Sequence, residues 1–172
     1  MQYKLNGMPA EGVKVLVASV HLSVPLIDNI PNTEKPLAEL QQLLSKVNDN
    51  YRRNNNGISI PTVLAGDFNS LSIDINGLAP ADVYRSIKTE GFESSYFAVE
   101  GCEPKYTTIS RGPDQNRDDD FIHCIDYIFF SKGLRPSKVL RVDPVDRDFL
   151  PFPASPSDHL PIIATIDFII NN

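Results

Sequence analysis

The chain has 172 residues, of which 41% are hydrophobic, and a formal net charge of −6. This length and composition predict a single globular domain with a substantial core. They exclude a membrane span, because no apolar run is long enough; the N-terminal residues lack a signal-peptide pattern, and the acidic balance disfavours non-specific binding to nucleic acid.

Two β-branched runs in the first half of the chain, at 13–20 and 60–65, are too short for typical helices and are expected to be buried strands. Apolar residues recur at helical spacing between them, which predicts an amphipathic helix from 34 to about 50. A strand–helix–strand crossover normally leaves its two strands parallel. Their C-terminal ends then meet at one edge, so His21 and Asp67 are expected to share it.

A second helix is expected at 80–91, which has Pro at its start, an apolar stripe and Gly at its end. Residues 111–120 contain no apolar side chain, and residues 143–156 are rich in Pro and Asp. Both segments are expected to be surface loops.

Three further strands are expected, at 121–131, 138–142 and 161–170. Asp126 lies inside the first of them, where a charge is costly unless it is paired or functional. His123 lies three positions earlier, so its side chain should point to the opposite face. The chain would then hold about five strands and two helices in one domain, without an internal repeat.

The two cysteines, Cys102 and Cys124, lack C-x-x-C spacing. This argues against a disulfide framework and fits a reducing compartment. We therefore expect an intracellular protein, with the cytoplasm favoured, in which both cysteines are small buried or half-buried packing residues.

Four short motifs place an acid, an amide or an imidazole at or near the end of an expected strand. They are VHL at 20–22, GDFN at 66–69, IDYI at 125–128 and SDH at 157–159. Strand ends that meet at one rim would bring these polar groups together, and such a set suits metal-assisted phosphate chemistry. The candidate site residues are His21, Asp67, Asn69, Asp126, Asp158 and His159.

Each of these residues also has a structural interpretation. Asp67 could exchange a proton with the reacting oxygens while Asn69 orients water or a metal ligand, but Asp and Asn after Gly also form turns. Asp126 could fix the tautomer of His159, or pair with Arg or a backbone amide instead. Asp158 is a candidate Mg²⁺ ligand or an Asx turn.

The motifs resemble the C-terminal half of the endonuclease/exonuclease/phosphatase superfamily. VLVASVHL, TVLAGDFNS, HCIDYIFFSK and SPSDHLPIIATI match the family's strand-plus-His, Gly-Asp-x-Asn, Asp-Tyr and Ser-Asp-His motifs. CEPKYTT narrows the likeness to the branch with nocturnin, Angel and the carbon-catabolite-repressor deadenylases. The resemblance implies that residues 1–172 are one partial α/β domain. It would be half of a four-layer α/β/β/α sandwich, with one mixed sheet and helices on one face.

The resemblance further implies a phosphodiesterase that depends on Mg²⁺, with Mn²⁺ as the alternative, and acts on RNA 3′ ends and poly(A). Asp67 becomes the acid/base group, Asn69 its orienting partner and Asp126 the orienter of His159. His21 and His159 become phosphate contacts. The metal side is assigned to Asp158, with Asp67 and Asn69.

Three departures from the family pattern keep other functions open. The family's N-terminal half, with the Glu that is the main Mg²⁺ ligand, has no counterpart here, so the chain alone is expected to be inactive and to expose an apolar sheet face. Val20 replaces a Thr, and Ile109 stands where an aromatic residue is common. The alternatives are a non-catalytic interaction module, and a hydrolase of a nucleotide cofactor, lipid headgroup or other small phosphoester.

Overall fold

The computed structural model of the chain describes residues 14–24, 26–27, 30–31, 34–54, 60–72, 81–110, 121–142 and 157–169. The expected loops at 111–120 and 143–156 lie outside these ranges. Within them, ten strands and three helices follow one another along the chain. In order they are β1 (Leu16–His21), β2 (Leu26–Ile27), β3 (Ile30–Pro31), α1 (Glu34–Asn54), β4 (Thr62–Asp67), α2 (Asp82–Thr89), β5 (Glu93–Ser94), α3 (Ser95–Glu100), β6 (Thr108–Ser110), β7 (Phe121–His123), β8 (Asp126–Phe130), β9 (Leu134–Val139) and β10 (Ala164–Phe168).

The central sheet has four strands in the order β1-β4-β8-β5. β1 runs parallel to β4, whereas β8 is antiparallel to both β4 and β5, so the expected mixed sheet is confirmed. The expected crossover is confirmed as well, since α1 lies between the parallel strands β1 and β4 in the chain. Three two-stranded pairs, β9–β10, β2–β3 and β6–β7, complete the β-structure of the described residues.

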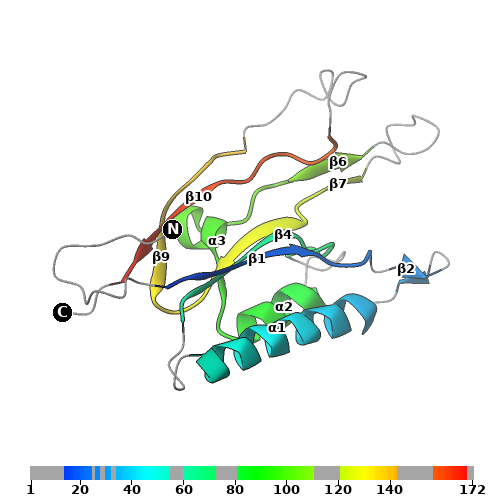
Figure 1. The fold of residues 1–172 in the computed structure, drawn as a ribbon. Helices are drawn as coiled ribbons and strands as arrows, with labels where there is room; N and C mark the ends of the chain where they lie inside the picture. Colours follow the sequence, from blue (N-terminus) through cyan, green and yellow to red (C-terminus); the bar gives the residue numbers. More distant parts are fainter. Residues whose placement is uncertain are drawn as a thin grey trace.

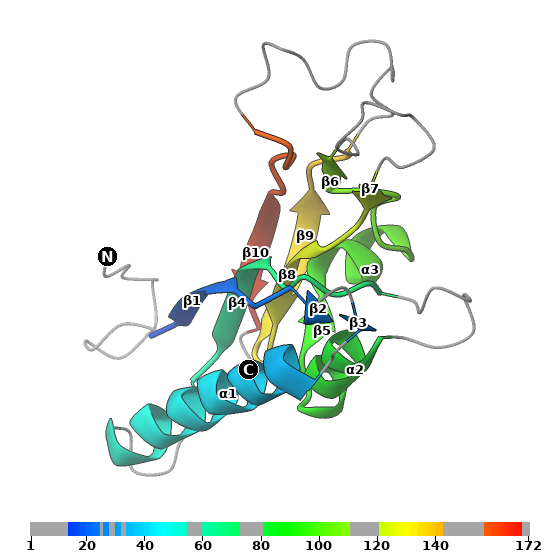
Figure 2. The same ribbon diagram turned by 90° about the vertical axis from the view of Figure 1, so that its right-hand side faces the viewer.

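Helices α1 and α2 lie side by side against one face of this sheet (Figure 1), and the perpendicular view in Figure 2 shows the same arrangement. The hydrophobic core lies between these two helices and the central sheet. Leu40 and Leu44 point into it from α1, one helical turn apart, as the amphipathic pattern predicts. None of the described helices is both long and apolar enough to span a bilayer.

Aromatic side chains form the centre of this core, where Phe68, Tyr84, Tyr127 and Phe129 pack edge to face or tilted with centroids 5.1–5.9 Å apart. Tyr127 and Phe129 are two residues apart on β8 and therefore share the face that meets the helices. By the same alternation, Asp126 lies on the opposite face.

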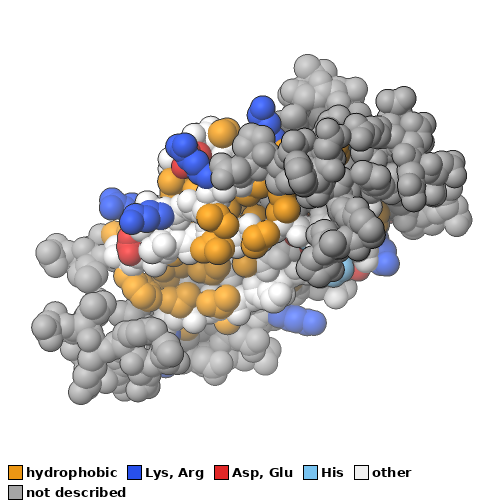
Figure 3. Space-filling view, turned by 90° about the horizontal axis from the view of Figure 1, so that it is seen from above, with side chains coloured by type: hydrophobic (Ala, Val, Ile, Leu, Met, Phe, Trp, Pro, Cys, Tyr) orange, Lys and Arg blue, Asp and Glu red, His pale blue; other side chains and the backbone are white. Residues whose placement is uncertain are grey.

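The face turned away from α1 and α2 carries exposed apolar side chains, which gather over the strands in Figure 3. Val17 of β1 is 68% exposed, because its neighbour Ala18 takes the core side of the strand. Leu140, Ile163 and Ile169, which flank β9 and β10, are 44%, 55% and 49% exposed. The resemblance to half of a four-layer sandwich had implied such an apolar face.

The prediction of a single strand at 121–131 was wrong, because this segment forms two strands that pair with different neighbours. β7 pairs with β6, and β8 pairs with β4 and β5. The two strands separate because the backbone amides of Ile125 and Asp126 donate to the Thr107 hydroxyl at 3.1 and 3.0 Å instead of to a neighbouring strand. His123 therefore lies on β7 and not on the strand of Asp126, so strand alternation does not relate the two side chains. His123 is exposed, and its ring meets that of Phe121 edge to face with the centroids 4.5 Å apart.

Other differences concern short or irregular elements. The strand expected at 138–142 is β9 (Leu134–Val139), which begins four residues earlier and includes Pro136 where its register with β10 shifts. The six-residue helix α3 was missed, although Ser94 caps it and Gly101 ends it with φ +77°. Cys124 is buried as expected, whereas Cys102 is exposed.

Candidate active site

Three polar side chains lie at one end of the central sheet because of its register. His21 is the last residue of β1 and pairs with Asp67, the last residue of β4. Asp126 is the first residue of β8 and pairs with Asp67 from the other side. Directly opposite residues of neighbouring strands project to the same face. The parallel β1–β4 pair thus brings His21 and Asp67 to one edge, as the sequence predicted.

Gly66 permits the close approach of β1 and β4 at this edge. Its φ is +142°, and a Cβ atom built on it would lie 2.0 Å from the carbonyl oxygen of Val20. No side chain fits so small a distance, so only glycine is compatible with this geometry. The Gly of the GDFN motif therefore determines how close Asp67 lies to His21.

His159 bridges the two carboxylates. Its Nδ1 lies 3.1 and 3.0 Å from Oδ1 and Oδ2 of Asp126, and its Nε2 lies 3.9 Å from Oδ2 of Asp67. Nε2 of His21 lies 3.6 Å from the same Asp67 oxygen. Side chains from both ends of the sequence thus meet at one place, and the predicted pairing of Asp126 with His159 is present.

The segment that carries His159 is held against the segment around Thr107. Thr108 and His159 form an isolated β-bridge. The amide of Ile109 donates to the carbonyl of Asp158 at 2.8 Å, and the amide of Leu160 donates to the carbonyl of Thr107 at 2.7 Å. These backbone hydrogen bonds hold the segment that carries the His159 imidazole in place next to Asp126, at the start of β8.

The environment shifts the proton affinities of two of these groups. Burial is the main cause that raises the pKa of Asp67, and the nearby charge of Asp126 raises it further, against the hydrogen bond from the Asn69 amide. For His159, burial opposes the charged ring, but the hydrogen bond and the charge of Asp126 outweigh it and raise the pKa of the imidazole. The site therefore places a carboxylate beside an imidazole that favours its charged form.

The two remaining candidate residues, Asn69 and Asp158, have different surroundings. Asn69 has φ 46°, its backbone amide donates to Oδ1 of Asp67 at 2.7 Å, and its Nδ2 donates to the carbonyl of Leu22 at 2.7 Å. It thus holds Asp67 and ties the end of β1 to the turn. Asp158 is exposed, and its negative charge contributes to the raised pKa of His159.

Ligand atoms of Asp67, Asp126 and His159 lie within 4.8 Å of one another, the grouping of metal-ligating type found in the part of the chain that the structure describes. Both oxygens of Asp126 already contact His159, and Oδ1 of Asp67 accepts from Asn69. Mg²⁺ prefers few carboxylates together with waters and substrate phosphates. The donors therefore fit a divalent ion held in part by Asp67, with further ligands from elsewhere.

One polar residue of this site, Thr107, was not among the candidates that the sequence motifs predicted. Thr107 is fully buried, and its hydroxyl donates to Oδ2 of Asp126 at 2.7 Å. The only signal was its place in the CEPKYTT motif, since a threonine carries no charge and its motif lies outside the four strand-end motifs.

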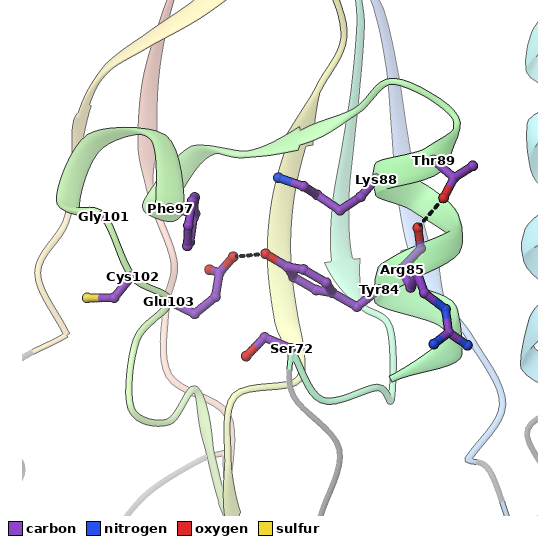
Figure 4. A pocket seen from close by; sticks show the side chains of 9 residues that line it. All are labelled: Ser72, Tyr84, Arg85, Lys88, Thr89, Phe97, Gly101, Cys102 and Glu103. Carbon is purple, nitrogen blue, oxygen red and sulfur yellow. Dashed lines mark hydrogen bonds between the residues drawn. The ribbon is translucent and has the colours of Figure 1, made fainter. Parts of the chain in front are cut away.

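A separate pocket of about 640 Å³ lies between α2 and α3 (Figure 4). Two of its polar side chains contact other lining residues: the Tyr84 hydroxyl donates to Oε1 of Glu103 at 2.7 Å, and the Lys88 amine lies 5.3 Å from the centre of the Phe97 ring. Burial raises the pKa of Glu103. None of its lining residues belongs to the cluster around Asp67.

Comparison with known proteins identifies the family of this fold and site. The sequence model of the Endonuclease/Exonuclease/phosphatase family matches residues 20–159, a range that begins just before His21 and ends at His159. The curated relatives include "Carbon catabolite repressor protein 4 homolog 4" of Arabidopsis thaliana, 30% identical over 169 residues. Another is "CCR4-Not complex 3'-5'-exoribonuclease subunit Ccr4" of Mycosarcoma maydis, 32% identical over 125 residues.

The match to these relatives covers 89% and 61% of this chain, but only 37% and 18% of their own lengths. Among solved structures, that of ANGEL2, described as a 2',3'-cyclic phosphatase, aligns with a TM-score of 0.61 at 21% identity. This alignment covers 88% of the chain and 56% of ANGEL2, and it supports the α/β fold. The chain spans about half of that structure and less of the curated relatives, and it belongs to the endonuclease/exonuclease/phosphatase family.

Proposed function

We propose that this chain supplies the distal half of a Mg²⁺-dependent phosphodiesterase, for which Mn²⁺ is the substitute ion. The family is one of metal-dependent phosphoester hydrolases. The observation that carries the proposal is the contact chain from Asp126 through His159 to Asp67 at the end of the sheet. Such paired acids and imidazoles suit proton transfer and charge stabilisation at a phosphorus centre.

In this proposal each residue acts through the atom that its neighbours leave free. Oδ1 of Asp67 is bound by the Asn69 amide, so Oδ2 is placed to accept a proton from the attacking water. Asp126 occupies Nδ1 of His159 and leaves Nε2 for a phosphoryl oxygen. The side chain of His21 is 78% exposed and would contact the phosphate from the solvent side.

The divalent ion is assigned to Asp67, with Asn69 and Asp158 as the other proposed oxygen donors. A bound Mg²⁺ would stabilise the negative charge on the phosphoryl oxygens. The family's metal dependence and the close approach of Asp67, Asp126 and His159 support this assignment.

The proposed substrate is the 3′ end of RNA, with poly(A) favoured. Its support is the similarity to the Mycosarcoma maydis protein, whose name describes a 3'-5'-exoribonuclease. Two observations favour a second candidate, a nucleotide cofactor or other small phosphoester. First, the aliphatic side chain of Ile109 has no ring on which a base could stack, and it is only 6% exposed, at a position of β6 paired with Ile122. Second, ANGEL2 is described as a 2',3'-cyclic phosphatase.

The apolar face supports a further part of the proposal, that an N-terminal half of the same domain packs on this sheet. Val17, Ile163 and Ile169 are each about half exposed or more, at 68%, 55% and 49%. Single chains seldom leave contiguous apolar surface of several hundred Å² in contact with water. The alignment covers 56% of the ANGEL2 structure, which supports this part of the proposal.

The test compares the chain alone with the chain extended by its upstream genomic sequence. Substrates are a 5′-labelled oligoadenylate, adenosine 2′,3′-cyclic phosphate and a nucleotide with a terminal phosphate, each with Mg²⁺, Mn²⁺ or chelator. We expect the extended protein to shorten the oligoadenylate with either ion and not with chelator. Preferential hydrolysis of a small phosphoester would support the second candidate, and inactivity on all three would leave a non-catalytic interaction module.

Variants of the extended protein test the assigned residues. Asp67→Asn and His159→Gln should each lower turnover about 10²-fold or more, because each removes a proposed proton-transfer or charge-stabilising group. His123→Gln is the matched control, since His123 is an exposed histidine outside the cluster. Turnover unchanged in Asp67→Asn or His159→Gln would remove that residue from the mechanism.

A further inference from the structure

The hydroxyl of Thr107 makes three hydrogen bonds around Asp126. It accepts from the backbone amides of Ile125 at 3.1 Å and Asp126 at 3.0 Å, and it donates to Oδ2 of Asp126 at 2.7 Å. A hydroxyl has one donor and two acceptor positions. All three are therefore used, and all three are directed at Asp126, the first residue of β8, and at Ile125 just before it. Thr107 itself is 0% exposed.

The backbone of Thr107 links the two segments that supply the Asp126–His159 pair. Its amide donates to the carbonyl of His123 at 2.9 Å, just before Asp126 in the chain. Its carbonyl accepts from the amide of Leu160 at 2.7 Å, just after His159. A substitution of the Thr107 side chain is therefore expected to alter the contact between the carboxylate of Asp126 and the imidazole of His159.

Oδ2 of Asp126 is shared between two donors. Thr107 reaches it at 2.7 Å, and Nδ1 of His159 lies 3.0 Å from it. The bond from Thr107 opposes rotation of the carboxylate about its χ2 torsion, which is otherwise soft. With the carboxylate fixed, Nδ1 of His159 faces an acceptor and its proton is held there, while Nε2 is left facing Asp67 at 3.9 Å.

We propose that Thr107 is a positioning residue, whose hydroxyl fixes the carboxylate of Asp126 and thereby keeps His159 in the tautomer with Nδ1 protonated. The tautomer follows from the contacts alone. The consequence for catalysis rests on the proposed function: in the charged ring Nδ1–H stays with Asp126, and Nε2–H is left to donate to a phosphoryl oxygen.

The first test is ¹⁵N nuclear magnetic resonance of the histidine rings in the 172-residue chain, at an alkaline pH where the ring is neutral. The chain has three histidines, so substitution of each in turn assigns their signals. Thr107→Val removes the hydroxyl at nearly constant volume, and Thr107→Ser keeps it. The matched control is Thr108→Val, because Thr108 is 2% exposed and its hydroxyl donates to the carbonyl of Asp158, not to Asp126.

We expect one dominant Nδ1–H tautomer for His159 in the native chain, in Thr107→Ser and in Thr108→Val, and a mixture of tautomers in Thr107→Val. An unchanged His159 signal in Thr107→Val would overturn the proposal, as would an equal effect of Thr108→Val. If Thr107→Val does not fold, Thr107→Cys replaces it, since a thiol is a weak donor. It should then give a tautomer mixture, and a spectrum identical to that of the native chain would overturn the proposal.

The second test uses the extended protein and steady-state kinetics. Thr107→Val should lower kcat about 10-fold or more while KM stays within about 2-fold, because the imidazole is misplaced in the reaction and substrate binding elsewhere is kept. Thr107→Ser should restore kcat. Equal losses in Thr107→Ser and Thr107→Val would show that the hydroxyl is not the cause. Failure of the proposed hydrolysis would leave the tautomer result standing, so the two ideas fail separately.

Discussion

Replacement of Gly66 by Ala should destabilise the sheet and open its functional end. The added Cβ would lie 2.0 Å from the Val20 carbonyl oxygen, far inside van der Waals contact, and 3.0 Å from the Val20 nitrogen. The backbone at φ +142° is itself unfavourable for alanine, which costs about 1–3 kcal/mol. Overpacking typically adds about 1–3 kcal/mol. A total of about 2–6 kcal/mol is a large share of the roughly 5–15 kcal/mol that stabilises a typical domain.

The assay is urea unfolding of the chain and of the Gly66→Ala variant, with Gly91→Ala as the matched control. Gly91 also has a positive φ, +85°, but a Cβ there meets no atom within 4 Å. The control should therefore lose only the backbone part, about 1–3 kcal/mol. If Gly66→Ala is no less stable than Gly91→Ala, the close approach of β1 to β4 does not determine the geometry of this edge.

Three further outcomes follow from groups described above. The folded state raises the pKa of His159, so the stability that its protonation contributes is fully present below about pH 6.5, the unfolded value, and is lost as pH rises through the higher folded pKa. Urea midpoints should fall over that range in the native chain and fall less in His159→Gln; equal slopes would contradict the assignment. Tyr127→Phe should cost about 1–3 kcal/mol, because the Tyr127 hydroxyl lies 2.8 Å from the carbonyl oxygens of both Ser70 and Cys124, and an unchanged urea midpoint would refute this. The chain alone should self-associate on a sizing column and bind a hydrophobic dye through its apolar face, and Val17→Lys should reduce both; a dye-inert monomer would count against the exposed face.

Sequence reasoning succeeded where one local pattern determines one element. The apolar spacing of α1 and the β-branched runs of β1 and β4 predicted a crossover, and the crossover predicted that His21 and Asp67 lie at one edge. These steps depended on periodicity and chain direction, which sequence carries directly. The Asp126–His159 contact was one of the interpretations that the residues left open, and the family resemblance selected it.

The errors lie where a contact between distant segments overrides a local pattern. Residues 121–131 read as one strand, but the Thr107 hydroxyl takes the amides of Ile125 and Asp126 and divides it. No local propensity reports a bond from a residue 18 positions away. Helix α3 was missed for a different reason, because its six residues give too few turns for a helical period to be visible.

The register that pairs Asp67 with Asp126 restricts which insertions or deletions this family can accept in β8. Side chains alternate between the two faces of a strand, so a slip of one residue would exchange Asp126 for Tyr127 at the position opposite Asp67. It would also turn a phenol that is 1% exposed out of the core. A slip of two residues would keep the alternation but place Ile128 opposite Asp67, so only the present register brings the two carboxylates together.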